Sequence, residues 1–272
     1  MSSILCLGNF GSGGEGQYAV AELMKYLYSK YKYKLVIGLG NNILPNGVSS
    51  LNDPQFKIKF EEPYKDLLSN IKFYNILGEV DYVTKKSVAN EIKYSQLNKH
   101  WILPHNFYCF KKFISGVPVE FIILDSNLTK TKNKKTQEMW AVNTLLESRS
   151  RWNIVISHHP WVSFNAESGG NLGDGELNLL YSKLNETKKI DLIISGHEHN
   201  QQHIYIPNKP NMIITGVGSS VNKSPIIKIY DELKFSSNEL GCCMVEFSKN
   251  RLNITFYNIN KKKIHNFSII KY

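Results

Sequence analysis

The chain has 272 residues, of which 42% are hydrophobic and 12% aromatic, so it can bury one large core. No stretch approaches the ~20 continuous apolar residues of a membrane span, and the N-terminus lacks the basic region and cleavage site of a secretion signal. The formal net charge of +10 favours solubility and weak attraction to polyanions. We therefore expect a soluble, intracellular protein of the cytoplasm that folds as a single domain over residues 1–272.

Short apolar runs alternate with helical patterns from the N-terminus to about residue 195. In the helical patterns, apolar residues recur every three or four positions. This alternation is typical of crossover connections, which build largely parallel sheets. We expect strands at residues 4–7, 35–39, 73–77, 121–124, 154–156 and 192–194, with helices at about 20–27, 136–148 and 176–184.

After residue 202 the pattern changes to short strand candidates without long helices between them. These candidates lie at residues 212–215, 226–229, 244–247, 252–256 and 265–270. We expect them to be antiparallel additions to the parallel sheets. The predicted fold class is α/β, a four-layer α/β/β/α sandwich in which two mixed sheets pack face to face between helices.

Polar residues follow the predicted strands at the ends where ligands usually bind. In open α/β sheets, ligands lie beyond the carboxyl ends of the strands. The segments found there are Gly8-Asn9, Gly40-Asn41-Asn42, Gly78-Glu79-Val80-Asp81, Ser157-His158-His159-Pro160 and Gly196-His197-Glu198-His199.

These five segments, in this order, resemble the metal-binding motifs GD, GDN, GNH(D/E), GHHP and GHxH of the calcineurin-like metallophosphoesterases. The stretch 40–54, with Pro45-Asn46-Gly47, is similar to purple acid phosphatases, as are residues 101–104 and 216–219. The resemblance covers about residues 5–220, and the remainder matches only in pattern. It implies a metallophosphoesterase fold with a binuclear centre that hydrolyses phosphoric monoesters.

The first metal site of that family has lost its anions here. The family places aspartates at positions 9 and 41, a tyrosinate at 44 and a histidine at 199. This chain has Asn9, Asn41, Leu44 and His199. Hard cations draw their affinity from carboxylate or phenolate charge, which amide oxygens do not replace. We predict that this site is empty and that no binuclear centre forms.

The second metal site keeps more of its ligands. The family uses the residue at 41, an asparagine at 79 and histidines at 158 and 197, and this chain has Glu79, His158 and His197. Two imidazoles and one carboxylate suit a single divalent Zn, Mn or Fe, with a position open for water or Asn41. His199 is a weaker candidate ligand, and position 159 is not a ligand in the family.

An alternative without metal is also open at this second site. Glu79 could point into solvent or pair with a basic side chain, while the histidines only hydrogen-bond one another. The sequence is therefore compatible with no metal or with one divalent metal.

Catalysis is not expected from the family's residues. The family's proton donor follows position 79, where this chain has Val80, and general acid help contributes ~10²–10⁴-fold. Our first hypothesis is a pseudophosphatase that serves as a binding or structural module for an unidentified protein partner. Apicomplexan glideosome-associated proteins that resemble acid phosphatases are a precedent for such reuse. The second is a mononuclear phosphoesterase using Glu79, His158 and His197.

A third hypothesis rests on the basic charge. Basic residues cluster at 130–135 and 261–263, without the interleaved aromatic residues that stack on bases. Solvated loops account for such clusters, but a basic protein could also bind nucleic acid or another polyanion weakly, with steep salt dependence. The glycines at 169, 170, 173 and 175 have no following P-loop lysine, so we expect a loop there and no phosphate cradle.

Overall fold

The apolar runs of the sequence form the inner strands of two seven-stranded mixed sheets. The computed structural model describes residues 2–130, 134–164, 175–221 and 230–272. In spatial order the first sheet contains β14 (Lys263–Ile270), β13 (Arg251–Asn258), β12 (Gly241–Phe247), β1 (Ser2–Leu7), β2 (Val36–Gly38), β3 (Phe73–Asn75) and β4 (Trp101–Ile102). The second contains β11 (Leu233–Ser237), β9 (Gln201–Ile204), β10 (Asn211–Thr215), β8 (Leu192–Ser195), β7 (Trp152–Ser157), β6 (Val117–Ile123) and β5 (Tyr108–Ile114).

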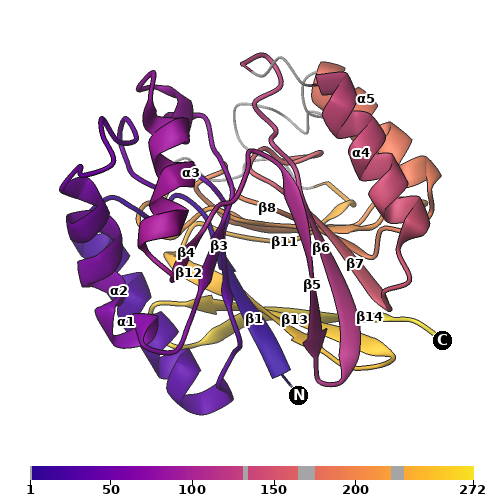
Figure 1. Cartoon of the computed structure of the whole chain (residues 1–272). Coiled ribbons are helices and arrows are strands. Elements are labelled where there is room, and N and C mark those ends of the chain that lie inside the picture. The colour runs from indigo at the N-terminus through magenta and orange to yellow at the C-terminus, as the bar shows by residue number, and fades with distance from the viewer. Residues whose placement is uncertain (1, 131–133, 165–174, 222–229) are drawn as a thin grey trace.

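Helices cover the outer faces of the two sheets, which gives four layers (Figure 1). The predicted fold class is confirmed. A short π-helical segment, Lys57–Glu61, leads into α2, and a single 3₁₀ turn, Val80–Tyr82, follows β3. The first sheet is covered by α1 (Glu15–Tyr31), α2 (Glu62–Leu68) and α3 (Ser87–Leu97), and the second by α4 (Lys134–Glu147) and α5 (Gly175–Glu186).

Buried side chains form two clusters that hold these layers together. The larger cluster lies between the sheets, where it includes Cys6 of β1 and Phe121 of β6, both fully buried, and it extends to the buried residues of α1 and α2. The smaller lies under α4 and α5 and joins Leu145 to Val155 of β7. Alternate residues of β6 and β7 therefore serve both cores, as expected for strands that are covered on both faces. Within the described residues, no helix is long and apolar enough to span a bilayer.

The strand pairing corrects one expectation for the region after residue 202. β12, β13 and β14 are antiparallel, but β10 pairs parallel with β8 and antiparallel with β9. The reason is that β9 follows β8 along the chain, but in the sheet β10 lies between β8 and β9. Apolar periodicity does not encode this order. The strand expected at 226–229 lies outside the described residues.

Two histidines join the sheets near one edge. His203 of β9 stacks on Phe267 of β14, with ring centroids 3.5 Å apart and an interplanar angle of 5°. Its Nδ1 lies 3.1 Å from Nε2 of His265, and its Nε2 lies 3.0 Å from Oδ1 of Asn211. Burial lowers the pKa of His203 to about 4, although the Asn211 hydrogen bond opposes this shift, and burial also lowers the pKa of His265.

From the lowered pKa values of these two histidines we expect the folded protein to lose stability in mild acid. Because the pKa of folded His203 lies below the unfolded value of about 6.5, protonation favours the unfolded chain. Its contribution is complete above about pH 6.5 and is lost as the pH falls towards about 4. Urea unfolding at pH 7.5 and pH 4.5 should show a smaller loss in His203→Gln than in the wild type. The carboxylates titrate in both proteins and cause a loss of stability that the two share, so only the difference between the proteins reports on His203. Equal losses would contradict the prediction.

Candidate metal centre

The site is built where parallel strands of both sheets end. β1, β2 and β3 run parallel in one sheet, and β7 and β8 run parallel in the other. At their carboxyl ends the chain turns through left-handed backbone conformations at Asn9 (φ 53°), Asn41 (φ 54°) and His197 (φ 60°). Asparagine tolerates this conformation better than most residues. These turns place polar side chains from both sheets around one point.

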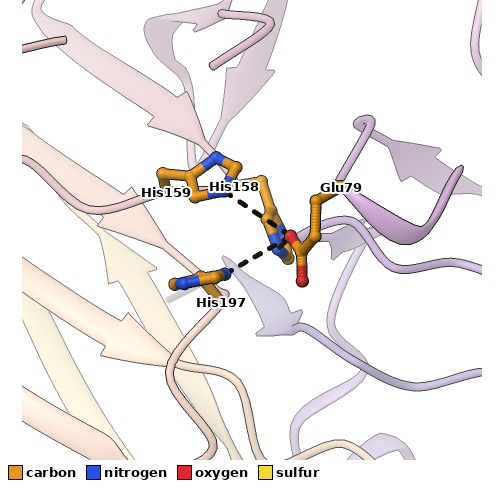
Figure 2. Close-up of side chains that lie close together, drawn as sticks. All are labelled: Glu79, His158, His159 and His197. Atoms are coloured by element: carbon orange, nitrogen blue, oxygen red, sulfur yellow. Dashed lines mark hydrogen bonds and ion pairs between the residues drawn. The ribbon is translucent and has the colours of Figure 1, made fainter. Parts of the chain in front are cut away.

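Four ligand-type side chains meet there: Glu79, His158, His159 and His197 (Figure 2). Their donor atoms all lie within 4.8 Å of one another. Oε2 of Glu79 is the common neighbour, at 2.6 Å from Nε2 of His158, 3.6 Å from Nε2 of His159 and 3.3 Å from Nδ1 of His197. The family resemblance makes position 159 a poor ligand candidate, because the family's metal contact is the first histidine of the pair, but here His159 joins the cluster.

His158 is oriented for ligation by its own backbone surroundings. Its side chain is fully buried, and its Nδ1 lies 2.6 Å from the carbonyl oxygen of Leu39. A carbonyl only accepts, so Nδ1 carries a proton and Nε2 is the ring nitrogen turned towards Glu79. Nε2 lies 2.6 Å from Oε2 of Glu79. Two acceptor atoms so close require a cation or a proton between them.

The donor set fits one divalent transition ion. Zinc bonds of 2.0–2.1 Å in tetrahedral geometry separate neighbouring ligand atoms by about 3.3 Å. The contacts of Glu79 with His197 and His159, at 3.3 and 3.6 Å, match that spacing, whereas the 2.6 Å contact with His158 would have to lengthen. Imidazole nitrogens with one carboxylate oxygen suit zinc, iron and manganese.

The electrostatics favour the ligating forms of Glu79 and His159 but not of His197. Burial lowers the pKa of His197, but its hydrogen bond with Glu79 overcomes this and raises the pKa. Burial opposes ionisation of Glu79, but its contacts with His158 and His197 overcome this and hold its pKa well below the usual range. Burial, together with the neighbouring histidines, lowers the pKa of His159 to about 3. A carboxylate and a neutral imidazole are the forms that bind a metal.

Beside this cluster, Asn9 and Asn41, two of the positions predicted to have lost their anions, are joined by amide hydrogen bonds. Nδ2 of Asn41 donates to Oδ1 of Asn9 at 2.9 Å and to Oε1 of Glu79 at 2.8 Å. Oδ1 of Asn41 accepts from the backbone N–H of Val80, and Nδ2 of Asn9 donates to the carbonyl of Gly216. Both asparagines are buried. Both amide groups are therefore satisfied within the protein.

A buried carboxylate, Asp81, holds the two loops of this network together. It accepts from the backbone N–H groups of Asn41, Asn42 and Gly78 at 2.8–3.0 Å. Burial raises its pKa to about 6, although these N–H groups oppose that shift. Sequence reasoning assigned Asp81 no role. Its position two residues after Glu79, inside a predicted metal motif, is the available signal.

The other residues singled out in the sequence are not members of the four-residue cluster. Nδ1 of His199 is 2.7 Å from Oγ of Ser220. Leu44 is half-buried, and its carbonyl accepts from Nζ of Lys59. Val80 begins the 3₁₀ turn after Glu79. Of the glycines considered for a phosphate cradle, Gly175 begins α5, and those at 169, 170 and 173 lie outside the described residues.

Comparisons with known proteins agree on the family. The calcineurin-like phosphoesterase profile matches residues 3–201. Purple acid phosphatase 7 of Arabidopsis thaliana is 26% identical over 99% of this chain and 86% of its own length. Human tartrate-resistant acid phosphatase type 5 is 23% identical over 84% of this chain and 77% of its own length.

Solved structures share the fold. GAP50, the anchor in the inner membrane complex of Plasmodium, superimposes with a TM-score of 0.86 at 23% identity, over 100% of this chain and 89% of that one. Purple acid phosphatase PPD1 from yellow lupin (Lupinus luteus) gives 0.73 at 12% identity, over 99% of this chain and 53% of that one. With its two mixed sheets and the profile match over residues 3–201, the chain belongs to the calcineurin-like phosphoesterase family, and its curated relatives include purple acid phosphatases.

Proposed function

We propose that this protein is a pseudophosphatase, a phosphoesterase fold used as a binding module that retains at most one divalent metal ion. The observation that carries the proposal is the hydrogen-bonded pair Asn9–Asn41. The family's first ion and its bridging carboxylate would lie where these two amides bond each other. Neutral amides supply no charge to hold a hard cation.

Loss of that ion removes the basis of phosphoryl transfer in this fold. A two-metal site stabilises both the attacking and the leaving oxygen of an in-line displacement. One ion cannot do both. Val80 also has no proton to give to a leaving group, so the ~10²–10⁴-fold help of a general acid is absent as well.

The remaining cluster is proposed to hold a single Zn, Mn or Fe through Glu79, His158 and His197, with His159 as a fourth donor. Such an ion would act as a Lewis acid on an oxygen bound to it. The chain's own contribution is to fix the donors: Leu39 sets the tautomer of His158, and Asn41 holds the second oxygen of Glu79. His158 is buried, whereas the side chains of Glu79 and His197 are each 38% exposed.

A binding role agrees with the fold's use elsewhere. GAP50, which shares the fold, is an anchor in the inner membrane complex of Plasmodium. Anchoring is a binding role, and we propose a protein partner for this chain.

Hydrolysis of an aryl phosphate tests the proposal directly. We expect turnover at the level of the buffer blank with zinc, manganese or iron added in turn, at acid and at neutral pH. Turnover comparable to an ordinary acid phosphatase would refute the pseudophosphatase. A matched sample of His158→Ala identifies any contaminating phosphatase, because a contaminant would be equally active in both.

A second candidate is a mononuclear phosphoesterase at the same cluster. The partial exposure of Glu79 and His197 favours it, because a phosphate ester could reach an ion held there. This alternative predicts slow turnover that requires added metal and disappears in His158→Ala. The same assay therefore separates the two proposals.

A further inference from the structure

A basic cleft lies at the opposite end of the sheets from the metal cluster. Lys34 and Lys72 precede β2 and β3, so they lie at the amino ends of strands whose carboxyl ends carry the cluster. Together with Lys112 of β5 they line a cleft of about 340 Å³ that also includes Tyr74 and Phe113. The three lysines come from separate segments that only the fold brings together.

The charge of this cleft is not neutralised by the protein. Lys34, Lys72 and Lys112 are exposed, and in the described parts of the chain none of them forms an ion pair. The adjacent Lys111 differs, because its Nζ lies 3.4 Å from Glu120. Nζ of Lys112 lies 5.6 Å from the ring centroid of Tyr74. Lysines gathered without acids maintain a positive potential that attracts anions.

Phe113 is exposed beside this cleft, near the tip of the hairpin formed by β5 and β6. Its side chain is 79% exposed, and the chain reverses just beyond it at Ser115 and Gly116, both with positive φ. Figure 1 shows this hairpin projecting at the end of the sheet where the N-terminus lies. A single exposed aromatic residue is ordinary. Here it is combined with a cluster of unpaired cations.

The other flank of the hairpin tip is also basic. A second cleft of about 420 Å³ is lined by residues 115–118 together with Arg151 and Lys249. Arg151 is occupied, because its Nε donates to the carbonyl of Lys249. The side chain of Lys249 is exposed on this flank. Phe113 thus has lysines on both sides.

We propose that the hairpin tip, defined as Phe113 with Lys34, Lys72, Lys112 and Lys249, binds an anionic phospholipid surface. Aromatic side chains lie at the level of lipid headgroups, and lysines extend their apolar stems so that the ammonium groups meet anionic lipids. A flat surface can contact a projecting aromatic residue and the cations on both of its sides at once. Single-stranded nucleic acid would instead need aromatic residues repeated along a groove.

Each lysine contributes only part of the attraction to the lipid surface, so the affinity should depend on how many lysines remain. Each lysine near an anionic leaflet contributes roughly fivefold in affinity, so removal of three lysines costs roughly 100-fold. The interaction should also fall as salt shortens the Debye length. The surface is independent of the metal cluster, so the proposal stands or falls without the pseudophosphatase assignment.

Vesicle co-sedimentation tests the proposal with the full chain. We expect binding to phosphatidylcholine vesicles that contain phosphatidylserine and none to vesicles of phosphatidylcholine alone. The triple variant Lys34→Gln, Lys72→Gln, Lys112→Gln should bind roughly 100-fold more weakly, and Phe113→Ser should weaken binding with the lysines intact. The matched controls are Lys85→Gln, Lys86→Gln, Lys93→Gln, which removes the same charge from exposed positions elsewhere, and Met139→Ser on α4, which is 65% exposed.

Three results would overturn the proposal. They are no binding to the anionic vesicles, equal weakening in the control triple, and binding to soluble polyglutamate as tight as to vesicles. The last would assign the surface to an acidic protein. Circular dichroism and urea unfolding of each variant confirm that it is folded, which exposed side chains should allow. If the triple variant does not fold, Lys112→Gln and Phe113→Ser singly decide the matter.

Discussion

Replacement of His158 by alanine is expected to remove the bound metal. Its Nε2 is the one fully buried donor of the cluster, already oriented by the carbonyl of Leu39. Changes to residues that only support a ligand cost about 10–100-fold in metal affinity, so loss of a ligand should cost at least about 100-fold. Elemental analysis and zinc titration should give about one ion per wild-type chain and far less in the variant.

His199→Ala is the matched control for this experiment. His199 belongs to the same motif as His197 but contacts Ser220 and lies outside the cluster. Its replacement should leave the metal content near that of the wild type. Metal-free wild-type protein, or equal loss in both variants, would show that the cluster is not the site.

Asn41→Asp is expected to destabilise the metal-free protein strongly. Nδ2 of Asn41 donates to Oε1 of Glu79 at 2.8 Å, and a carboxylate there would set two anions against each other in a buried place. The hydrogen bond to Asn9 would be lost too. We expect a loss of about 3 kcal/mol in the free energy of unfolding, measured with urea in the presence of a chelator.

Divalent metal should reverse much of that loss, because the new carboxylate is also a ligand and a ligand that binds only the folded state stabilises it. The control is Asn46→Asp, which makes the same change at an exposed residue of the same loop and should alter stability by no more than about 0.5 kcal/mol. If Asn41→Asp were as stable as the wild type without metal, the Asn9–Asn41 network would not be the stabilising element described here.

The sequence predicts the parallel core well because its strands are fully buried. Runs such as residues 154–156 and 192–194 are apolar without interruption, and they became β7 and β8. β5 was missed because it lies at the sheet edge, where its lysines and exposed Phe113 break any apolar pattern. β9 was missed because its buried residues are polar, with Gln201 and Gln202 inside the protein.

The part of the candidate site that can be predicted from the sequence consists of residues that directly follow predicted strands. Glu79, His158 and His197 follow strands, so the parallel topology brings them together. The contact of His159 depends on side-chain direction, and the role of Asp81 depends on three backbone N–H groups that only the folded loops align. Spacing along the chain carries neither kind of information.

Because Asn9 and Asn41 lie in left-handed turns, the charge of this site can change without a change in its backbone shape. Asparagine and aspartate differ by one atom group and both tolerate positive φ, so exchange between them alters the electric field without altering the path of the chain. Such a centre could therefore lose or regain its carboxylates one residue at a time while the backbone kept its path. The backbone path of this fold can therefore persist whether asparagine or aspartate stands at these turns.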